Sequence, residues 1–139
     1  MKTRLNPYLG FRGDAREAIE FYATVFGGTP TISTFDDFHA SDDPEEKDLI
    51  MHSELVTDAG FSLMASDTPE SMPFTPGSNF SVSLSGDDDD ELRGYWQKLV
   101  VGGTVSLPLE RAPWGDTFGM CVDQFGVSWM VNVVQAQSD

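Results

Sequence analysis

Two short sequence motifs occur twice in this chain, in the same order. Residues 25–29 read VFGGT and residues 100–104 read VVGGT, while residues 60–64 read GFSLM and residues 126–130 read GVSWM. The period of roughly 70 residues is too long for a solenoid repeat. The duplication therefore predicts two small modules that share one core and form a site between them.

Each half also carries a helix signal. Apolar residues at three- and four-residue spacing predict amphipathic helices over residues 14–27 and 87–101, each with aspartate at its start. Gly27-Gly28 ends the first helix. Asn6 precedes the first helix and Asn79 the second at matching distances, which suggests that these two residues correspond.

Strand signals complete the pattern. Alternating apolar and polar residues predict a strand before each helix and three strands after it. Glycines at positions 60 and 126 fit hairpin turns. Each half is thus expected to fold as βαβββ, with later strands over residues 29–36, 49–57, 61–66, 104–110, 117–122 and 127–134.

The predicted organisation is a single domain of two modules over residues 1–139. The first module spans residues 1–68, a proline-rich linker spans residues 69–78 and the second module spans residues 79–139. Within the first module, residues 36–48 are acidic and polar, so we expect a mobile loop there.

Charge and composition exclude several classes of function. The formal net charge of −15 opposes binding to nucleic acid or anionic membranes, because proteins bind such polyanions mainly through Lys and Arg side chains. No apolar run approaches the roughly 20 residues that cross a bilayer, and no signal-peptide segment is present, so we expect a cytoplasmic protein. Cys121 is the single cysteine, which rules out an intrachain disulfide; its apolar strand predicts a buried small hydrophobe.

Several motifs resemble one known superfamily. Residues 114–119 read WGDTFG and residues 123–126 read DQFG. With the paired βαβββ modules, they resemble the vicinal oxygen chelate superfamily, which includes glyoxalase I, extradiol dioxygenases, fosfomycin resistance enzymes and bleomycin resistance proteins. NPYL at residues 6–9, FRGD at 11–14 and MHSEL at 51–55 are most similar to its PhnB-like branch, often labelled a 3-demethylubiquinone-9 3-methyltransferase domain.

This resemblance implies an architecture. It implies an α+β fold in which two βαβββ modules form a cupped mixed sheet with the helices outside, as in the glyoxalase/bleomycin resistance fold. It also implies a homodimer.

The resemblance also assigns the places of a metal site. Metal-using members carry one His or Glu on the first and last strands of each module, and these places fall on Asn6, Met64, Asn79 and Met130. Neutral amides and thioethers are poor ligands for the divalent ions of such centres. We therefore expect no metal at this position and no cofactor.

His52 and Glu54 are the candidate catalytic residues. They stand two apart on a predicted strand and share a face, which the resemblance places inside the cup. One interpretation is a His satisfied by a neighbouring carboxylate or backbone group on a solvated sheet. The other is a general base steered by Glu54, or part of a metal site to which Asp116 adds a carboxylate.

The remaining candidates line the predicted cup. Hydroxyl, amide, thioether and aromatic groups there favour uncharged or amphipathic organic ligands, and the acidic charge favours a cationic one. Trp114 is placed at the mouth. The candidate ligand-binding residues are Asn6, Tyr8, Met64, Asn79, Trp114, Asp116, Phe118, Met120 and Met130.

Three functions remain open from sequence. The leading one is a metal-free protein that binds an unknown small organic molecule. The second is an isomerase, a lyase or a metal-dependent enzyme that uses His52 and Glu54. The third is the ubiquinone methyltransferase activity of the branch label, although the chain has no Gly-x-Gly-x-x-Gly motif after a strand.

Overall fold

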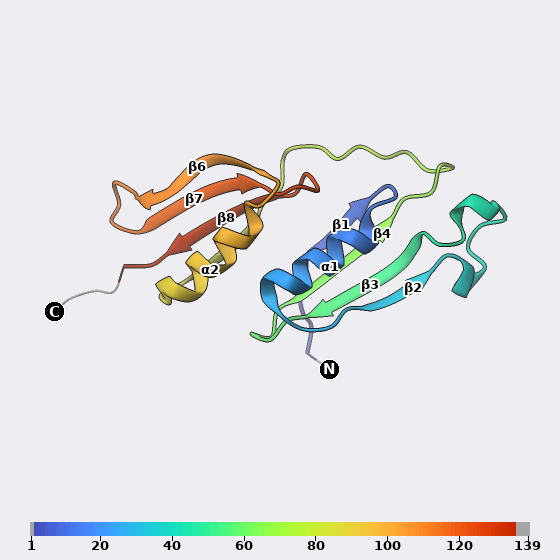
Figure 1. The fold of residues 1–139 in the computed structure, drawn as a ribbon, viewed down its shortest axis with the longest axis horizontal. Helices are drawn as coiled ribbons and strands as arrows, with labels where there is room; N and C mark the ends of the chain where they lie inside the picture. The colour runs from blue at the N-terminus through green and yellow to red at the C-terminus, as the bar shows by residue number, and fades with distance from the viewer. Residues whose placement is uncertain (1, 136–139) are drawn as a thin grey trace. The chain divides into compact units, whose positions relative to one another are not determined.

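The computed structural model describes residues 2–135. The chain divides into two compact units, residues 1–76 and 77–139, and each is described by itself (Figure 1). Among the described residues, neither helix combines the length and apolar character that a membrane span requires.

The first unit is one helix on a four-stranded mixed sheet. Its strand order is β1-β4-β3-β2, with β1 parallel to β4 and the other neighbours antiparallel. The elements are β1 (Tyr8–Phe11), α1 (Ala15–Phe26), β2 (Thr31–Thr34), β3 (Ile50–Val56) and β4 (Ser62–Asp67), with two 3-10 turns, η1 (Asp36–Phe38) and η2 (Pro44–Glu46).

The second unit repeats this topology. Its strand order is β5-β8-β7-β6, and β5 is parallel to β8. The predicted α+β fold of two βαβββ modules is therefore confirmed. The elements are β5 (Val82–Gly86), α2 (Asp89–Leu99), β6 (Thr104–Arg111), β7 (Thr117–Val122) and β8 (Ser128–Val133).

The duplication extends to individual hydrogen bonds of one hairpin. In the first unit the backbone amide of Thr57 donates to the carbonyl of Phe61 at 2.8 Å. In the second, the amide of Asp123 donates to the carbonyl of Val127 at 2.9 Å. Thr57 and Asp123 also accept, through side-chain oxygens, the amides of Phe61 and Val127. The two hairpins are equivalent, so Met64 corresponds to Met130.

The strand register corrects one correspondence expected from sequence. Tyr8 pairs with Met64 and Ser83 pairs with Met130. Tyr8 therefore corresponds to Ser83, and Asn6 to Ser81 instead of Asn79. The match of Asn6 with Asn79 was wrong because pairing with the last strand sets the register, whereas the two Asn-led segments are alike only in composition.

The repeated glycines bring each helix end close to its own sheet. A Cβ on Gly28 would lie 2.3 Å from the carbonyl oxygen of Val56, and one on Gly103 would lie 2.3 Å from that of Val122. No side chain fits at such a distance. The Gly-Gly motif is thus a steric requirement in both units.

The two helices bury the faces that the sequence predicts. α1 packs on β3 and β4 through Ala15, Ala18, Ile19, Tyr22, Val25 and Phe26, all of which are buried. α2 packs on β5 and β8. Trp129 of β8 is buried in this core, and its indole Nε1 donates to Asp123 Oδ2 at 2.8 Å.

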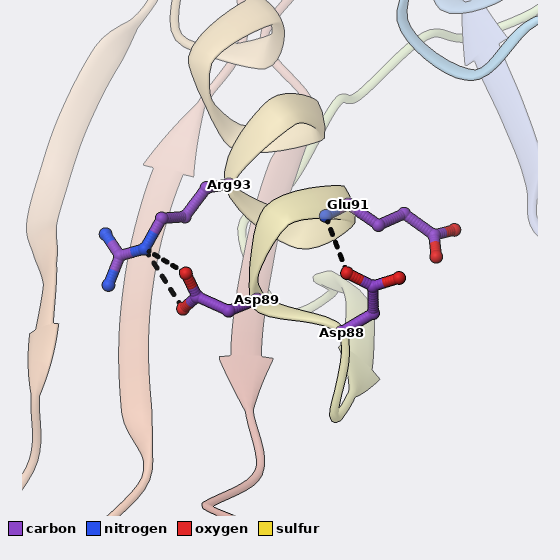
Figure 2. A network of polar contacts seen from close by, with 4 residues as sticks. All are labelled: Asp88, Asp89, Glu91 and Arg93. Carbon is purple, nitrogen blue, oxygen red and sulfur yellow. Dashed lines mark hydrogen bonds and ion pairs between the residues drawn. The ribbon is translucent and has the colours of Figure 1, made fainter.

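The helix starts differ from one another. Asp88 caps α2, since its Oδ1 accepts the amide of Glu91 at 3.1 Å, and Arg93 forms an ion pair with Asp89 at 2.8 Å (Figure 2). In contrast, the side chain of Asp14 accepts no capping hydrogen bond from α1. The cap of α1 is the buried carboxylate of Asp67.

The acidic segment 36–48, expected as a mobile loop, contains the turns η1 and η2. Glu46 in η2 is only 8% exposed. Its carboxylate accepts the Ser41 hydroxyl at 2.7 Å and the Glu70 amide at 2.9 Å. These hydrogen bonds, led by that of Ser41, hold the pKa of Glu46 below its usual value.

Part of the predicted linker is held against the first unit. The guanidinium of Arg12 donates to the carbonyls of Pro69 and Met72 and lies 5.3 Å from the ring centroid of Phe74. The segment is therefore fixed at three points before the chain enters the second unit.

Candidate functional site

In the first unit, one sheet face lies away from α1. Ser53, Leu55 and Ala65 are fully buried, whereas His52 and Glu54 alternate with them on the opposite face. The prediction that His52 and Glu54 share a face is thus confirmed. The register brings Tyr8, Met64, Glu54 and Thr31 into one row across the four strands of this face.

Tyr8 is the hydrogen-bond partner of His52. The Tyr8 hydroxyl lies 3.1 Å from His52 Nδ1, and the two ring centroids are 5.7 Å apart. Tyr8 stands on β1 and His52 on β3, so the contact spans β4. The direction of the bond depends on the tautomer of neutral His52. If the Tyr8 hydroxyl donates to Nδ1, the ring proton is on Nε2; if the hydroxyl accepts from Nδ1, Nε2 carries no proton and can act as a base.

Glu54 takes part in a different contact. Its Oε2 accepts the hydroxyl of Ser62 at 2.8 Å, and Ser62 is itself buried. The sequence suggested that Glu54 steers His52. In the structure, His52 is hydrogen-bonded to Tyr8 and Glu54 to Ser62, so each side chain has its own partner.

In the second unit, the corresponding face has apolar side chains on β7 and β8. A Cβ on Gly119 would meet Trp96 of α2 at 2.9 Å, so Gly119 faces the helix and its neighbours Phe118 and Met120 face away. Met120 pairs with Met130 across β7 and β8. Two thioethers and a phenyl ring therefore form a contiguous half-buried surface on the open face.

Asp116 lies at one end of this surface. Its Oδ1 accepts the amide of Gln135 at 3.0 Å, and its Oδ2 accepts Nδ2 of Asn132 at 3.1 Å. These two bonds, and a weaker contribution from the side chain of Trp114, hold the pKa of Asp116 below its usual value, against the opposing effect of desolvation. The carboxylate is therefore ionised at neutral pH.

Trp114 stands beside Asp116 in the turn between β6 and β7. Its side chain is 63% exposed, and its ring lies 5.6 Å from the ring of Phe118 in an edge-to-face arrangement at 60°. Gly115 adopts a φ of 104°, which favours glycine. This turn aims an aromatic ring at the end of the apolar surface.

The four places assigned to a metal are distributed over both units. Met64 and Met130 are equivalent positions on β4 and β8, Asn6 is half-buried just before β1, and Asn79 is exposed ahead of β5. Ser81, which corresponds to Asn6, offers only a hydroxyl. This set of donors does not fit a divalent transition metal. Within residues 2–135 no three His, Cys, Asp or Glu side chains are grouped closely enough to hold one.

Some contacts of the site were missed from the sequence. The pairing of Tyr8 with His52 has no local signal, because the two residues lie on strands that are not neighbours. The amide of Gln135, which fixes Asp116, follows the end of β8. Neither contact could be found from alternation, which assigns a residue to a face but not to a partner.

Comparisons with known proteins agree with this architecture. The profile of the family described as 3-demethylubiquinone-9 3-methyltransferase matches residues 3–132. Protein PA1353 from Pseudomonas aeruginosa is 39% identical, with a TM-score of 0.80 over 97% of this chain and 100% of that one. The PhnB protein from Bacillus cereus, a putative 3-demethylubiquinone-9 3-methyltransferase, is 25% identical, with a TM-score of 0.73 over 95% and 100%.

A more distant structure shares the fold alone. A glyoxylase/bleomycin resistance protein/dioxygenase domain from Frankia is 13% identical, with a TM-score of 0.66 over 99% of this chain and 96% of that domain. The chain therefore belongs to the family described as 3-demethylubiquinone-9 3-methyltransferase, and its fold is that of the glyoxalase/bleomycin resistance proteins.

Proposed function

We propose that this protein binds a small organic molecule, without a metal, on the open sheet face of its second unit. One observation carries the proposal: Phe118, Met120 and Met130 form a contiguous apolar surface on the side of the sheet that α2 does not cover. Ligand sites are largely apolar with a few placed polar groups, and here Asp116 and Asn132 supply the polar groups.

The chemistry of the residues favours binding over the reaction in the family description. A fold hosts many functions, so membership alone does not assign methyl transfer. Thioethers and aromatic rings make adaptable contacts with organic ligands but carry out no proton transfer. The donor set at the superfamily's metal positions also supports a function that needs no metal.

A thermal-shift screen tests the proposal. Wild-type protein is screened against neutral, anionic and cationic metabolites and S-adenosylmethionine, beside the double variant Phe118→Ser/Met130→Ser. Ligands that raise the melting temperature of wild type are expected to lose most of that effect in the variant. Phe80→Ser is the matched control, because Phe80 is 84% exposed and lies outside the strands. Hits that survive the double variant would contradict the proposal, and so would a screen whose single hit is S-adenosylmethionine.

A second candidate function rests on the Tyr8–His52 contact. A hydrogen-bonded phenol and imidazole at 3.1 Å on an exposed face have the composition of an acid–base pair. Such a pair would remove a proton next to a carbonyl group, as an isomerase or lyase does.

Proton abstraction has a readout that needs no product. Purified protein is incubated in D₂O with a panel of ketones and 2-oxo acids, and loss of the α C–H signal is followed by NMR. Exchange that His52→Gln and Tyr8→Phe both abolish, while the control His39→Asn retains it, would support the enzyme. Exchange at the buffer rate for every compound would remove this candidate.

A further inference from the structure

We propose that the open face of the second unit selects organic cations, namely alkylated ammonium groups, through Trp114, Phe118 and two flanking carboxylates. This inference rests on the proposed binding function and names the class of ligand. Its argument combines the position of the acids, the arrangement of the rings and the distribution of basic side chains.

Two carboxylates flank Phe118 on the open face. Glu110 on β6 is the direct cross-strand partner of Phe118, so the two side chains leave the sheet on the same side. Asp116 stands two residues before Phe118 along the chain, immediately before β7, and its bond to Asn132 places it on that side as well. A ligand on the phenyl ring therefore meets negative charge from two directions.

The basic residue of this hairpin lies on the opposite face. Arg111 pairs with Thr117, and both alternate with residues of the open face. By this register, the side chain of Arg111 leaves the sheet on the side opposite to Phe118. The overall charge of −15 adds a field of the same sign as the two acids.

The aromatic rings supply the second element of recognition. Trp114 is 63% exposed and meets Phe118 edge to face, so much of the indole surface is accessible to a ligand beside the phenyl ring. Alkylated ammonium ions bind over such faces, and indole is the strongest of the aromatic side chains in this interaction. A strongly hydrated ion without alkyl groups would gain less, because Met120 and Met130 offer only apolar contacts.

The carboxylate of Asp116 is suited to this role because it is already held in place. Two donors orient it, the amide of Gln135 at 3.0 Å and Nδ2 of Asn132 at 3.1 Å. Both donors are neutral amides, so they leave the negative charge of the carboxylate unpaired and able to attract a cation. The charge is present without any rearrangement when the ligand arrives.

The test compares choline with its neutral isostere 3,3-dimethylbutan-1-ol. Both are titrated into ¹⁵N-labelled full-length protein, and the indole N–H signal of Trp114, assigned with Trp114→Phe, reports the site. We expect choline to shift this signal with an affinity at least about fivefold higher than that of the alcohol. The affinity for choline should fall as the salt concentration is raised.

Variants separate charge from structure. Glu110→Gln and Asp116→Asn should each reduce the affinity for choline and leave that for the alcohol unchanged, whereas Asp42→Asn, at an exposed acid of the first unit, should change neither. Glu110→Gln is the safer probe, since Asp116 also accepts the backbone amide of Gln135.

The outcomes distinguish the two proposals. Equal affinities for choline and the alcohol, or a choline affinity that both variants leave unchanged, would overturn the selection of cations while the binding function stands. Binding of the alcohol without binding of choline would do the same. If neither probe shifts Trp114 and the metabolite screen yields no hit, both proposals fail.

Discussion

The Oδ1 atom of Asp67 accepts the backbone amide of Ala15 at 3.0 Å, so the last strand of the first sheet caps the helix that packs on it. The same carboxylate accepts the amides of Gly13 at 2.8 Å and Ile50 at 2.9 Å. One buried side chain therefore ties together the start of α1, the start of β3 and the end of β4.

Replacing Asp67 should be costly. Asp67→Ala leaves three amides without their acceptor in a site where the residue is 6% exposed. We expect a loss of about 2–3 kcal/mol in the free energy of unfolding, measured by urea denaturation. Asp14→Ala is the control, because the side chain of Asp14 makes no capping hydrogen bond, and it should cost less than about 0.5 kcal/mol. Equal losses would show that Asp14 caps the helix in solution.

The two Gly-Gly motifs predict a matched pair of destabilised variants. Gly28→Ala and Gly103→Ala each place a Cβ 2.3 Å from a carbonyl oxygen, and Gly28 also has a φ of 93°. Each variant should lose on the order of 2–4 kcal/mol of stability. The measurement is chemical denaturation of both, which also tests whether the duplicated positions are equivalent in energy.

Gly94 provides the opposite control for this pair. It lies inside α2, and a Cβ there would meet nothing within 4 Å. Gly94→Ala should raise stability by roughly 0.5–1 kcal/mol, since alanine favours the helix. A loss at Gly94 similar to that at Gly28 would mean that the approach to the carbonyl groups is not the cause.

The hydrogen bonds of Asp116 predict a dependence of stability on pH. They lower its pKa below the usual 3.8 in the folded protein. The stabilisation is therefore present above 3.8 and is lost as the pH falls through the folded value. The melting temperature of wild type should exceed that of Asp116→Asn at pH 7, and this difference should shrink below pH 3.8. A constant difference across the acid range would contradict the assignment.

Cys121 should react only when the protein unfolds. Its side chain is 1% exposed, and burial, with a contribution from the charge of Asp123, raises the pKa of the thiol to about 11. The thiolate is the reactive form, so an aromatic disulfide reagent at pH 8 should modify the folded protein slowly and the guanidinium-unfolded protein at once. Rapid modification of the folded protein would show that β7 opens.

Much of the fold could be predicted because the helix and turn signals of each half are local in sequence. Gly60 has a φ of 94° and Gly126 of 88°, which is what a hairpin glycine implies. The apolar spacing around Ile19 and Tyr22 marked the buried side of α1, and both residues are fully buried. Signals of this kind depend on a few neighbouring residues, so they can be recognised without knowing how the rest of the chain folds.

Long-range partners were not predictable in the same way. No role could be assigned to Asp67 from the sequence, because its three amide partners, Gly13, Ala15 and Ile50, are far away in sequence. Tyr8 was assigned to the site without a partner. Alternation gives the face of a strand residue, but the strand order, which brings Tyr8 to His52, is a property of the whole sheet.

His52 can be tested as a surface residue whose loss leaves the fold intact. Its side chain is exposed, and its hydrogen bond is to Tyr8, which is 53% exposed, so no buried partner is left without a bond. His52→Asn should change stability by less than about 0.5 kcal/mol in thermal or urea unfolding. The control is His39→Asn, because His39 has a φ of 49° and asparagine tolerates that conformation whereas alanine does not. A loss of several kcal/mol at His52 alone would make it a structural residue and would remove the Tyr8–His52 pair from the candidates for proton transfer.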